Sequence, residues 1–270
     1  EDAHGGHDEA HLRRELAASE DHRARFRREA RLMARLTHPA IVPVHAYGER
    51  ALPDGSHVAW FVMRYVTGQS LAERLGRERR LPAREVAHVL AELALALDYA
   101  HGEGVVHRDL KPENVLLERA ATSGGYPRVL LSDFGVAALP SSDPLPGEAG
   151  MSVGTPHYMS PEQLVGEHAI DGRSDLYALG VLGFTLLAGR PPFQGRSIEE
   201  LSARHLLQRA PSLHRLVPGA PASLVAAIER CLAKDPARRW ERGSELAAAL
   251  RGRRFLVMPK WAEALRAAVI

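Results

Sequence analysis

Lysine is the residue type that this sequence most clearly lacks. Of its 35 Lys+Arg residues, only Lys111, Lys234 and Lys260 are lysines, and no lysine precedes position 111. Because the basic residues are spread along the chain and the net charge is only +2, a nucleic-acid partner is not expected. The excess of arginine is typical of a biased base composition, but the scarcity of lysine makes each present or missing lysine informative.

Cysteine and long apolar segments are also scarce. Cys231 is the single cysteine, so an intrachain disulfide is excluded, and we expect a reducing, cytoplasmic location. The longest uncharged apolar run, residues 176–189, is too short to span a bilayer and predicts a buried helix instead. The chain begins at Glu1 without a methionine or an apolar signal segment, which we interpret as a cut end.

Hydrophobic periodicity predicts secondary structure for most of the remaining sequence. Residues 1–11 show no periodicity and are expected to be disordered. Residues 26–36 carry apolar side chains at three- and four-residue intervals, which predicts an amphipathic helix. Residues 41–47 and 58–66 are rich in β-branched and aromatic residues, which predicts an antiparallel pair of strands. Further helices are expected at about 82–102, 171–188, 198–208, 221–233 and 243–252.

These segments predict an α+β fold in two parts. A small, β-containing part covers residues 12–66, and a larger, mainly helical part covers residues 67–252. Residues 64–70 are the expected hinge between them. The tail at 253–270 is interpreted either as the start of a linker or as an extra packed helix.

Three short motifs occur in a fixed order in the larger part. Residues 107–114 read His-Arg-Asp-Leu-Lys-Pro-Glu-Asn, residues 133–135 read Asp-Phe-Gly, and residues 160–162 read Ser-Pro-Glu. Together they resemble the catalytic loop, the metal-binding triplet and the Ala-Pro-Glu motif of protein kinases. From about residue 21 to 252 the chain resembles a bacterial eukaryotic-like (Hanks-type) serine/threonine protein kinase, which implies a two-lobed fold, ATP and Mg²⁺ as cofactors, and protein substrates.

The resemblance implies a role for each polar residue of these motifs. Asp109 would orient the substrate hydroxyl and accept its proton, and Lys111 would lie on the transferred phosphate. Asn114 and Asp133 would bind Mg²⁺, an ion that prefers oxygen ligands and few protein carboxylates. A solvated surface position is the alternative for Lys111 considered alone.

The nucleotide site is expected to draw on residues outside the motifs. Glu29 resembles the glutamate that pairs with a strand lysine, although a solvated helix-face carboxylate is the alternative. Met63 resembles the gatekeeper, and it could equally be an ordinary core residue. The backbones of Arg64 and Val66 would meet the adenine edge, and Leu116 would pack beneath the ring.

Several other residues resemble regulatory or structural positions of the family. Arg108 implies control by phosphorylation, because an arginine beside the catalytic aspartate requires an anionic partner. Ser152 is the best candidate for that phosphorylation. These positions are completed by Phe134 and Gly135 of the metal-binding triplet, Thr155 of the substrate-binding segment, Asp175 as the anchor of the catalytic loop, and Glu162 paired with Arg239. Arg238 is the alternative partner of Glu162.

Two features of the family are missing from the sequence. No Gly-x-Gly-x-x-Gly pattern precedes residue 26, and the lysine expected to pair with Glu29 would fall near Ala10. Arg13 and Arg14 are poor replacements, because a planar guanidinium does not reproduce an ammonium. We therefore expect weak phosphoryl transfer and an incomplete small lobe. The surface left exposed where the first strands belong is expected to favour self-association.

Two interpretations of the missing features are open. In the first, the chain is a fragment of an active kinase, and the joint retention of Asp109, Lys111, Asn114 and Asp133 favours it. In the second, the chain is a pseudokinase or scaffold that acts by protein interaction.

Overall fold

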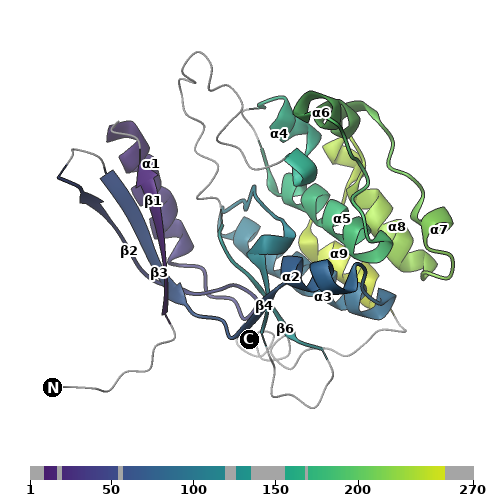
Figure 1. The fold of residues 1–270 in the computed structure, drawn as a ribbon, viewed down its shortest axis with the longest axis horizontal. Coiled ribbons are helices and arrows are strands. Elements are labelled where there is room, and N and C mark those ends of the chain that lie inside the picture. Colours follow the sequence, from purple (N-terminus) through teal and green to yellow (C-terminus); the bar gives the residue numbers. More distant parts are fainter. Residues whose placement is uncertain are drawn as a thin grey trace.

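The computed structural model describes residues 9–16, 20–53, 57–118, 126–134, 156–167 and 170–252. A small part built around a three-stranded sheet and helix α1 stands beside a larger helical part, and the two are joined by residues 65–67 (Figure 1). The two-lobed α+β fold predicted from the sequence is confirmed.

The small lobe consists of one helix and one antiparallel sheet. Its elements are β1 (Glu9–Leu16), α1 (Glu20–Met33), β2 (Val44–Ala51) and β3 (His57–Arg64). The strand order is β1-β3-β2, so β3 is central. The rings of Phe26 on α1 and Phe61 on β3 meet edge to face at 5.2 Å, which packs the helix on the sheet.

Strand β1 corrects one sequence prediction. Residues 9–11 belong to a strand, so the prediction of disorder for all of residues 1–11 is wrong at its last three positions. Residues 12–16 lie in the same strand. Apolar residues alternate with polar ones at positions 10, 12 and 16 of β1, but Arg14 interrupts the alternation. Pairing with β3 over eight positions completes the strand.

A second small sheet lies at the junction of the lobes. It contains β4 (Gly68–Ser70), β5 (Val115–Glu118) and β6 (Arg128–Leu131) in the order β4-β5-β6. The backbone of Val42 donates to Leu131 O at 2.9 Å, and Leu131 N donates to Ala40 O at 2.9 Å. The small lobe is therefore hydrogen-bonded directly to the strand that leads to Asp133.

The large lobe is mostly helical. Its elements are α2 (Leu71–Glu78), α3 (Ala83–Gly102), η1 (Pro112–Asn114), η2 (Pro156–Tyr158), α4 (Pro161–Leu164), α5 (Gly172–Ala188), α6 (Ile198–Leu207), α7 (Leu213–Leu216), α8 (Ala222–Cys231), η3 (Pro236–Arg238) and α9 (Gly243–Arg251). Each long helix of this lobe lies within two residues of its predicted bounds. No helix in the described ranges is long and apolar enough to cross a membrane.

Helix α5 is the centre of the large lobe. Every residue from Ser174 to Leu187 is buried, which explains the 176–189 apolar run as a helix surrounded by protein. Figure 1 shows α5 between α4 and α8. A Cβ on Gly180 would lie 2.5 Å from the Cβ of Cys231, so a glycine is required where α8 crosses. Cys231 is a free, buried thiol, as expected.

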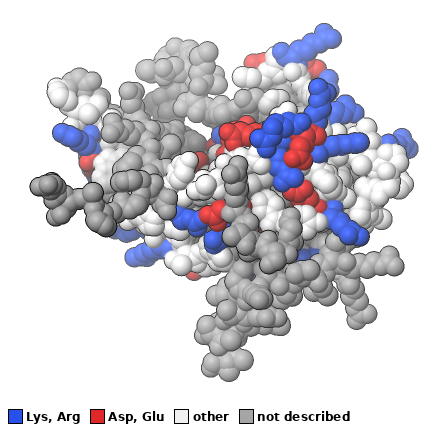
Figure 2. All heavy atoms as spheres, turned by 60° about the horizontal axis from the view of Figure 1, so that its bottom comes forward, with Lys and Arg blue, Asp and Glu red and all other residues white. Residues whose placement is uncertain are grey.

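Charges of both signs are mixed on the face shown in Figure 2, where Lys and Arg side chains lie beside Asp and Glu side chains. The described residues include exposed or partly exposed ion pairs, such as Arg242 with Asp98 and Arg204 with Glu200. Exposed pairs of this kind contribute little to stability. On the described surface in this view, positive and negative side chains are therefore interspersed.

Candidate active site

The catalytic loop between α3 and η1 is fixed by the first turn of α5. The two carboxylate oxygens of Asp175 accept from the backbone N–H groups of His107 and Arg108, each at 2.8 Å. His101 Nε2 lies 2.7 Å from the same carboxylate. Burial raises the pKa of Asp175, but the interactions with His101 and His107 outweigh it and hold the pKa below its ordinary value.

Three predicted catalytic residues meet around one carboxylate. Lys111 Nζ lies 2.6 Å from Asp109 Oδ2. Asn114 Nδ2 donates to the backbone oxygen of Asp109 at 2.8 Å and to Oδ2 at 3.3 Å. Because residues 112–114 form the short helix η1, residues five apart in the sequence can form these contacts. Asp109 and Lys111 remain partly exposed, so a substrate can reach them.

Asp133 is placed beside Asn114 by the residue that precedes it. The backbone N–H and the hydroxyl of Ser132 both donate to Asn114 O, at 2.9 and 3.2 Å. The Ser132 hydroxyl also lies 3.2 Å from Asp133 Oδ2. Asp133 has a φ of 58°, a conformation that non-glycine residues rarely adopt. The next residue, Phe134, packs on the His107 ring with the ring centroids 4.6 Å apart. The structure thus brings together Asp109, Lys111, Asn114 and Asp133.

The residues predicted to meet the adenine edge span the end of β3: Met63 and Arg64 lie in the strand, and Val66 follows it. Met63 lines a cavity of about 20 Å³ together with Phe61 and Phe134. The N–H of Arg64 already donates to Pro43 O at 3.1 Å, so its carbonyl is the group that could meet adenine. Leu116 on β5 is half-buried and offers an apolar surface at the junction of the lobes.

The strand register of the small lobe places position 10, where the family resemblance implies a lysine, relative to the cavity. Ala10 on β1 lies directly opposite Met63 on β3, and directly paired positions share one face of an antiparallel sheet. Position 10 is therefore on the face that carries the cavity residues Phe61 and Met63. Glu29 lies in α1, but its side chain is outside the described part of the structure.

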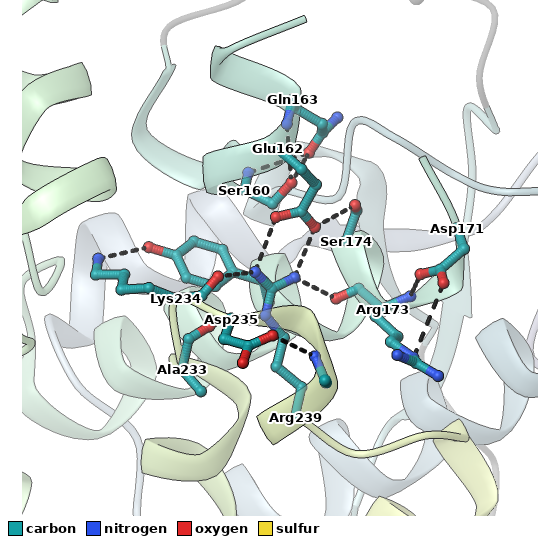
Figure 3. A network of polar contacts seen from close by, with 12 residues as sticks. Ser160, Glu162, Gln163, Asp171, Arg173, Ser174, Ala233, Lys234, Asp235 and Arg239 are labelled. Atoms are coloured by element: carbon teal, nitrogen blue, oxygen red, sulfur yellow. Dashed lines mark hydrogen bonds and ion pairs between the residues drawn. The ribbon is translucent and has the colours of Figure 1, made fainter. Parts of the chain in front are cut away.

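The predicted ion pair of the large lobe is present. Both terminal nitrogens of Arg239 contact the Glu162 carboxylate, at 2.6 and 2.8 Å (Figure 3). Ser174 Oγ donates to the same carboxylate at 2.5 Å. Burial raises the pKa of Glu162, but the bonds from Arg239 and Ser174 outweigh it and lower the pKa. Arg238 is 82% exposed and contacts Asp235 instead, which rules out the alternative.

Arg239 is buried with all its donors used. Besides Glu162, its guanidinium donates to the backbone oxygens of Ala233, Lys234 and Arg173, at 2.8 to 3.0 Å. A buried arginine is tolerated only when its charge and its five N–H groups find partners. The pair therefore joins α4, the start of α5 and the segment before η3.

Sequence reasoning missed three residues that hold the site together, namely His101, Gln163 and Ser174. His101 contacts Asp175, Ser174 contacts Glu162, and Gln163 Nε2 donates to Arg108 O at 2.9 Å. Gln163 and Ser174 directly adjoin the predicted residues Glu162 and Asp175, and this adjacency was the only available signal.

Three predicted regulatory residues, Gly135, Ser152 and Thr155, lie outside the described residues. Arg108 is described, and its buried Nε has no hydrogen-bond partner among the described residues. Its φ is 65°. A buried polar atom without a partner carries a free-energy cost, so Arg108 is the candidate to bind an anionic group.

Comparisons with known proteins agree with this geometry. Residues 11–249 match the family model described as protein kinase domain. The chain belongs to the protein kinase family. It is 43% identical over 238 residues to the serine/threonine-protein kinase PknJ of Mycobacterium tuberculosis, covering 87% of this chain and 39% of that protein. It is 40% identical over 233 residues to the serine/threonine-protein kinase pkn3 of Myxococcus xanthus, covering 84% and 41%.

The similarity extends to a solved structure. The crystal structure of the Mycobacterium tuberculosis PknI kinase domain matches with a TM-score of 0.66 and 34% identity, covering 89% of this chain and 84% of that chain. The chain is therefore a serine/threonine protein kinase domain. It spans less than half the length of the two curated relatives named above.

Proposed function

We propose that this kinase domain transfers the γ-phosphate of ATP to serine or threonine hydroxyls of protein substrates. The observation that carries the proposal is the contact of Asp109 with Lys111 and Asn114, with Asp133 held next to Asn114 through Ser132. Phosphoryl transfer requires little covalent chemistry from the protein, so positioning and charge neutralisation suffice.

Each residue of this group has one task in the proposed mechanism. Asp109 orients the attacking hydroxyl and accepts its proton. Lys111, 2.6 Å from that carboxylate, is placed to neutralise charge that develops on the transferred phosphoryl group. Asn114 donates to the backbone oxygen of Asp109 and thereby fixes the distance between Asn114 and Asp109.

The donor set fits Mg²⁺. The nitrogen of the Asn114 amide is engaged with Asp109, which leaves its oxygen, with the Asp133 carboxylate beside it, as ligands. The described residues contain no cluster of three or more His, Cys, Asp or Glu side chains that could hold a metal. An asparagine and one carboxylate suit Mg²⁺, because this ion keeps waters and phosphate oxygens as its other ligands. Bound Mg²⁺ would neutralise the phosphates.

The nucleotide would lie between the lobes. The carbonyl of Arg64 and the backbone of Val66 would bind the adenine edge, Leu116 would form the floor beneath the ring, and Met63 would close the inner end. Glu29 would require a cationic partner, which the sequence does not supply near Ala10.

Transfer by this chain is expected to be weak. Loss of one preorganised electrostatic donor lowers rates by roughly 10²- to 10³-fold, and position 10, opposite Met63, carries alanine. The glycine pattern that would cover the phosphates is likewise missing before α1.

The test measures incorporation of labelled phosphate into a generic basic protein, with Asp109→Asn as the matched control. Slow incorporation that disappears in Asp109→Asn is expected. Vigorous Asp109-dependent transfer would contradict the weak activity, and its complete absence would favour the second candidate, a pseudokinase that acts by protein interaction.

Nucleotide binding separates the two candidates further. An ATP-dependent rise in melting temperature that requires Mg²⁺ and is lost in Asp133→Ala supports the enzyme. A pseudokinase with a disused metal site would show no such metal dependence.

Regulation would act through Arg108. Its buried Nε, which has no partner in the part of the chain that the structure describes, supports binding of a phosphorylated side chain, for which Ser152 is the candidate. Thr155 would contact the catalytic loop, and Gly135 would allow the turn after Phe134.

The setting of the reaction is inferred from the same features. The free thiol of Cys231 suits the reducing cytoplasm, where ATP and Mg²⁺ are available. The mixed surface charge in Figure 2 favours protein partners over nucleic acid. Self-association through the small-lobe sheet stays a prediction.

A further inference from the structure

Gln163 connects helix α4 to the catalytic loop. Its amide nitrogen Nε2 donates to the carbonyl oxygen of Arg108 at 2.9 Å, and Arg108 directly precedes Asp109. Its amide oxygen Oε1 accepts from the backbone N–H and the hydroxyl of Ser160, each at 3.1 Å. One end of the amide therefore caps its own helix, and the other end reaches the residue before the proposed base.

Arg108 requires such support because its backbone is strained. Its φ of 65° lies in the left-handed region, which a non-glycine residue adopts only where the surroundings fix it. Side chains of two other elements bind the backbone polar groups of Arg108. Asp175 of α5 accepts from its N–H at 2.8 Å, and Gln163 of α4 donates to its oxygen.

The peptide unit between Arg108 and Asp109 is thereby held at both ends. Its oxygen accepts from Gln163, and its N–H donates to His107 Nδ1 at 3.2 Å. This bond makes Nδ1 an acceptor, so the other ring nitrogen carries the proton and donates to Ser132 O at 2.9 Å. With the peptide plane fixed, the direction in which the Asp109 side chain leaves the backbone is also fixed.

Gln163 is itself held rigidly. It follows Glu162, whose carboxylate is bound by Arg239 and Ser174 (Figure 3). Helix α4 cannot shift without breaking that buried pair. The same figure shows Gln163 next to Ser160 at the top of the network, so the glutamine starts from a fixed position on a fixed helix.

We propose that Gln163 is a positioning residue for Asp109, acting through the carbonyl of Arg108. The proposal rests on the kinase activity proposed above, because positioning Asp109 matters only for that reaction. The hydrogen-bond bridge itself can be measured without that activity. The bridge joins α4 to Arg108, the residue directly before the proposed base Asp109.

The decisive variant is Gln163→Glu. A glutamate keeps an oxygen to accept from Ser160, so the cap of α4 survives, but its carboxylate cannot donate to Arg108 O. We expect kcat to fall about 10-fold, the loss of one hydrogen bond near a reacting group. The KM for ATP and the melting temperature should stay within about twofold and about 2 °C of wild type. Gln194→Glu, the same change in an exposed loop, should leave kcat unaltered.

The pH dependence gives a signature that a general loss of stability would not produce. A protonated glutamate has the shape of glutamine and can donate to Arg108 O. The ratio of the variant rate to the wild-type rate should therefore rise as the pH is lowered from about 8 to about 5.5, toward the glutamate pKa. A ratio that stays constant or falls over that range overturns the proposal.

Hydrogen exchange separates failure of this proposal from failure of the proposed function. The amides of Arg108 and Asp109 should exchange about 10-fold faster in Gln163→Glu than in wild type, while those of α5 stay unchanged. If wild type transfers no phosphate, the kinase proposal fails, and the exchange rates still decide whether the bridge exists. Faster exchange with an unchanged kcat, or unchanged exchange, overturns the positioning role.

Discussion

The two lobes of this kinase domain differ in how completely their polar groups are arranged for catalysis. In the large lobe, the buried charges of Asp175, Glu162 and Arg239 have several partners each, and they fix the catalytic loop and α4. In the small lobe, a three-stranded sheet carries alanine at position 10, opposite Met63. The large lobe thus holds the candidate catalytic residues in place, whereas alanine stands at the small-lobe position where the family resemblance places a lysine.

This difference teaches that the candidate catalytic contacts of the large lobe form independently of the residue at position 10 of the small lobe. The contacts among Asp109, Lys111 and Asn114 lie within one loop anchored to α5, so they do not depend on the small lobe. Charge neutralisation of the nucleotide requires both lobes. Four predictions, from the largest expected effect to the smallest, can break or sharpen this contrast.

Arg239→Met should have the largest effect. It leaves the Glu162 carboxylate buried without its cation, which costs about 3 to 5 kcal/mol of unfolding free energy. Urea denaturation measures the loss. Arg238→Met is the matched control, since that side chain is 82% exposed and should change the free energy of unfolding by less than about 0.5 kcal/mol. Equal losses in both variants would show that the large lobe does not depend on this pair.

Ala10→Lys should raise the rate of phosphate transfer, because it adds a cation to the small lobe. The lysine would stand on the face of the sheet shared with Met63, and the rate of phosphate transfer should rise by up to about 10²-fold. His11→Lys is the control, because position 11 pairs with Val62 and lies on the opposite face. A gain from both variants would point to a general charge effect, and a gain from neither would remove the missing lysine as the cause.

His205 should make the large lobe sensitive to acid. Burial lowers its pKa to about 4, with Lys234 adding to the effect, whereas an unfolded histidine titrates near 6.5. The folded pKa is the lower one, so stability is fully present above about pH 6.5 and falls as the pH drops toward 4. We expect a loss of roughly 2 to 3 kcal/mol over this window, and a smaller loss in His205→Gln, by thermal melts across pH. An identical pH dependence in the variant would contradict the assignment.

Arg79→Gly should have the smallest effect, a gain in stability. Arg79 follows α2 with a φ of 58°, where glycine avoids the steric cost of a Cβ. Relief of that strain should exceed the entropic cost of glycine by about 0.5 kcal/mol. Arg80→Gly, one residue later and without a positive φ, should give no gain in the same thermal melts.

Much of the fold could be predicted from the sequence, because periodicity reports burial. The 176–189 run became α5, and the two β-rich segments became β2 and β3. Strand β1 has only a short alternation of apolar and polar residues, interrupted at Arg14, and the three-residue strand β4 is too short to show any. Each depends on pairing with a distant segment rather than on its own composition.

The candidate site was partly predictable for a similar reason. Asp109, Lys111 and Asn114 lie within six residues, so one contiguous motif contains their geometry. His101, Ser174 and Gln163 act on partners 74, 12 and 55 residues away. No local pattern encodes such a distance.

The sequence by itself therefore determined the family, the candidate reacting residues and the absence of a lysine before position 111. Only the tertiary structure decided which side chains hold those residues in place and where position 10 lies relative to the cavity. The physical reason is that composition and periodicity act along the chain, whereas hydrogen bonds and sheet register act between segments that meet only after folding.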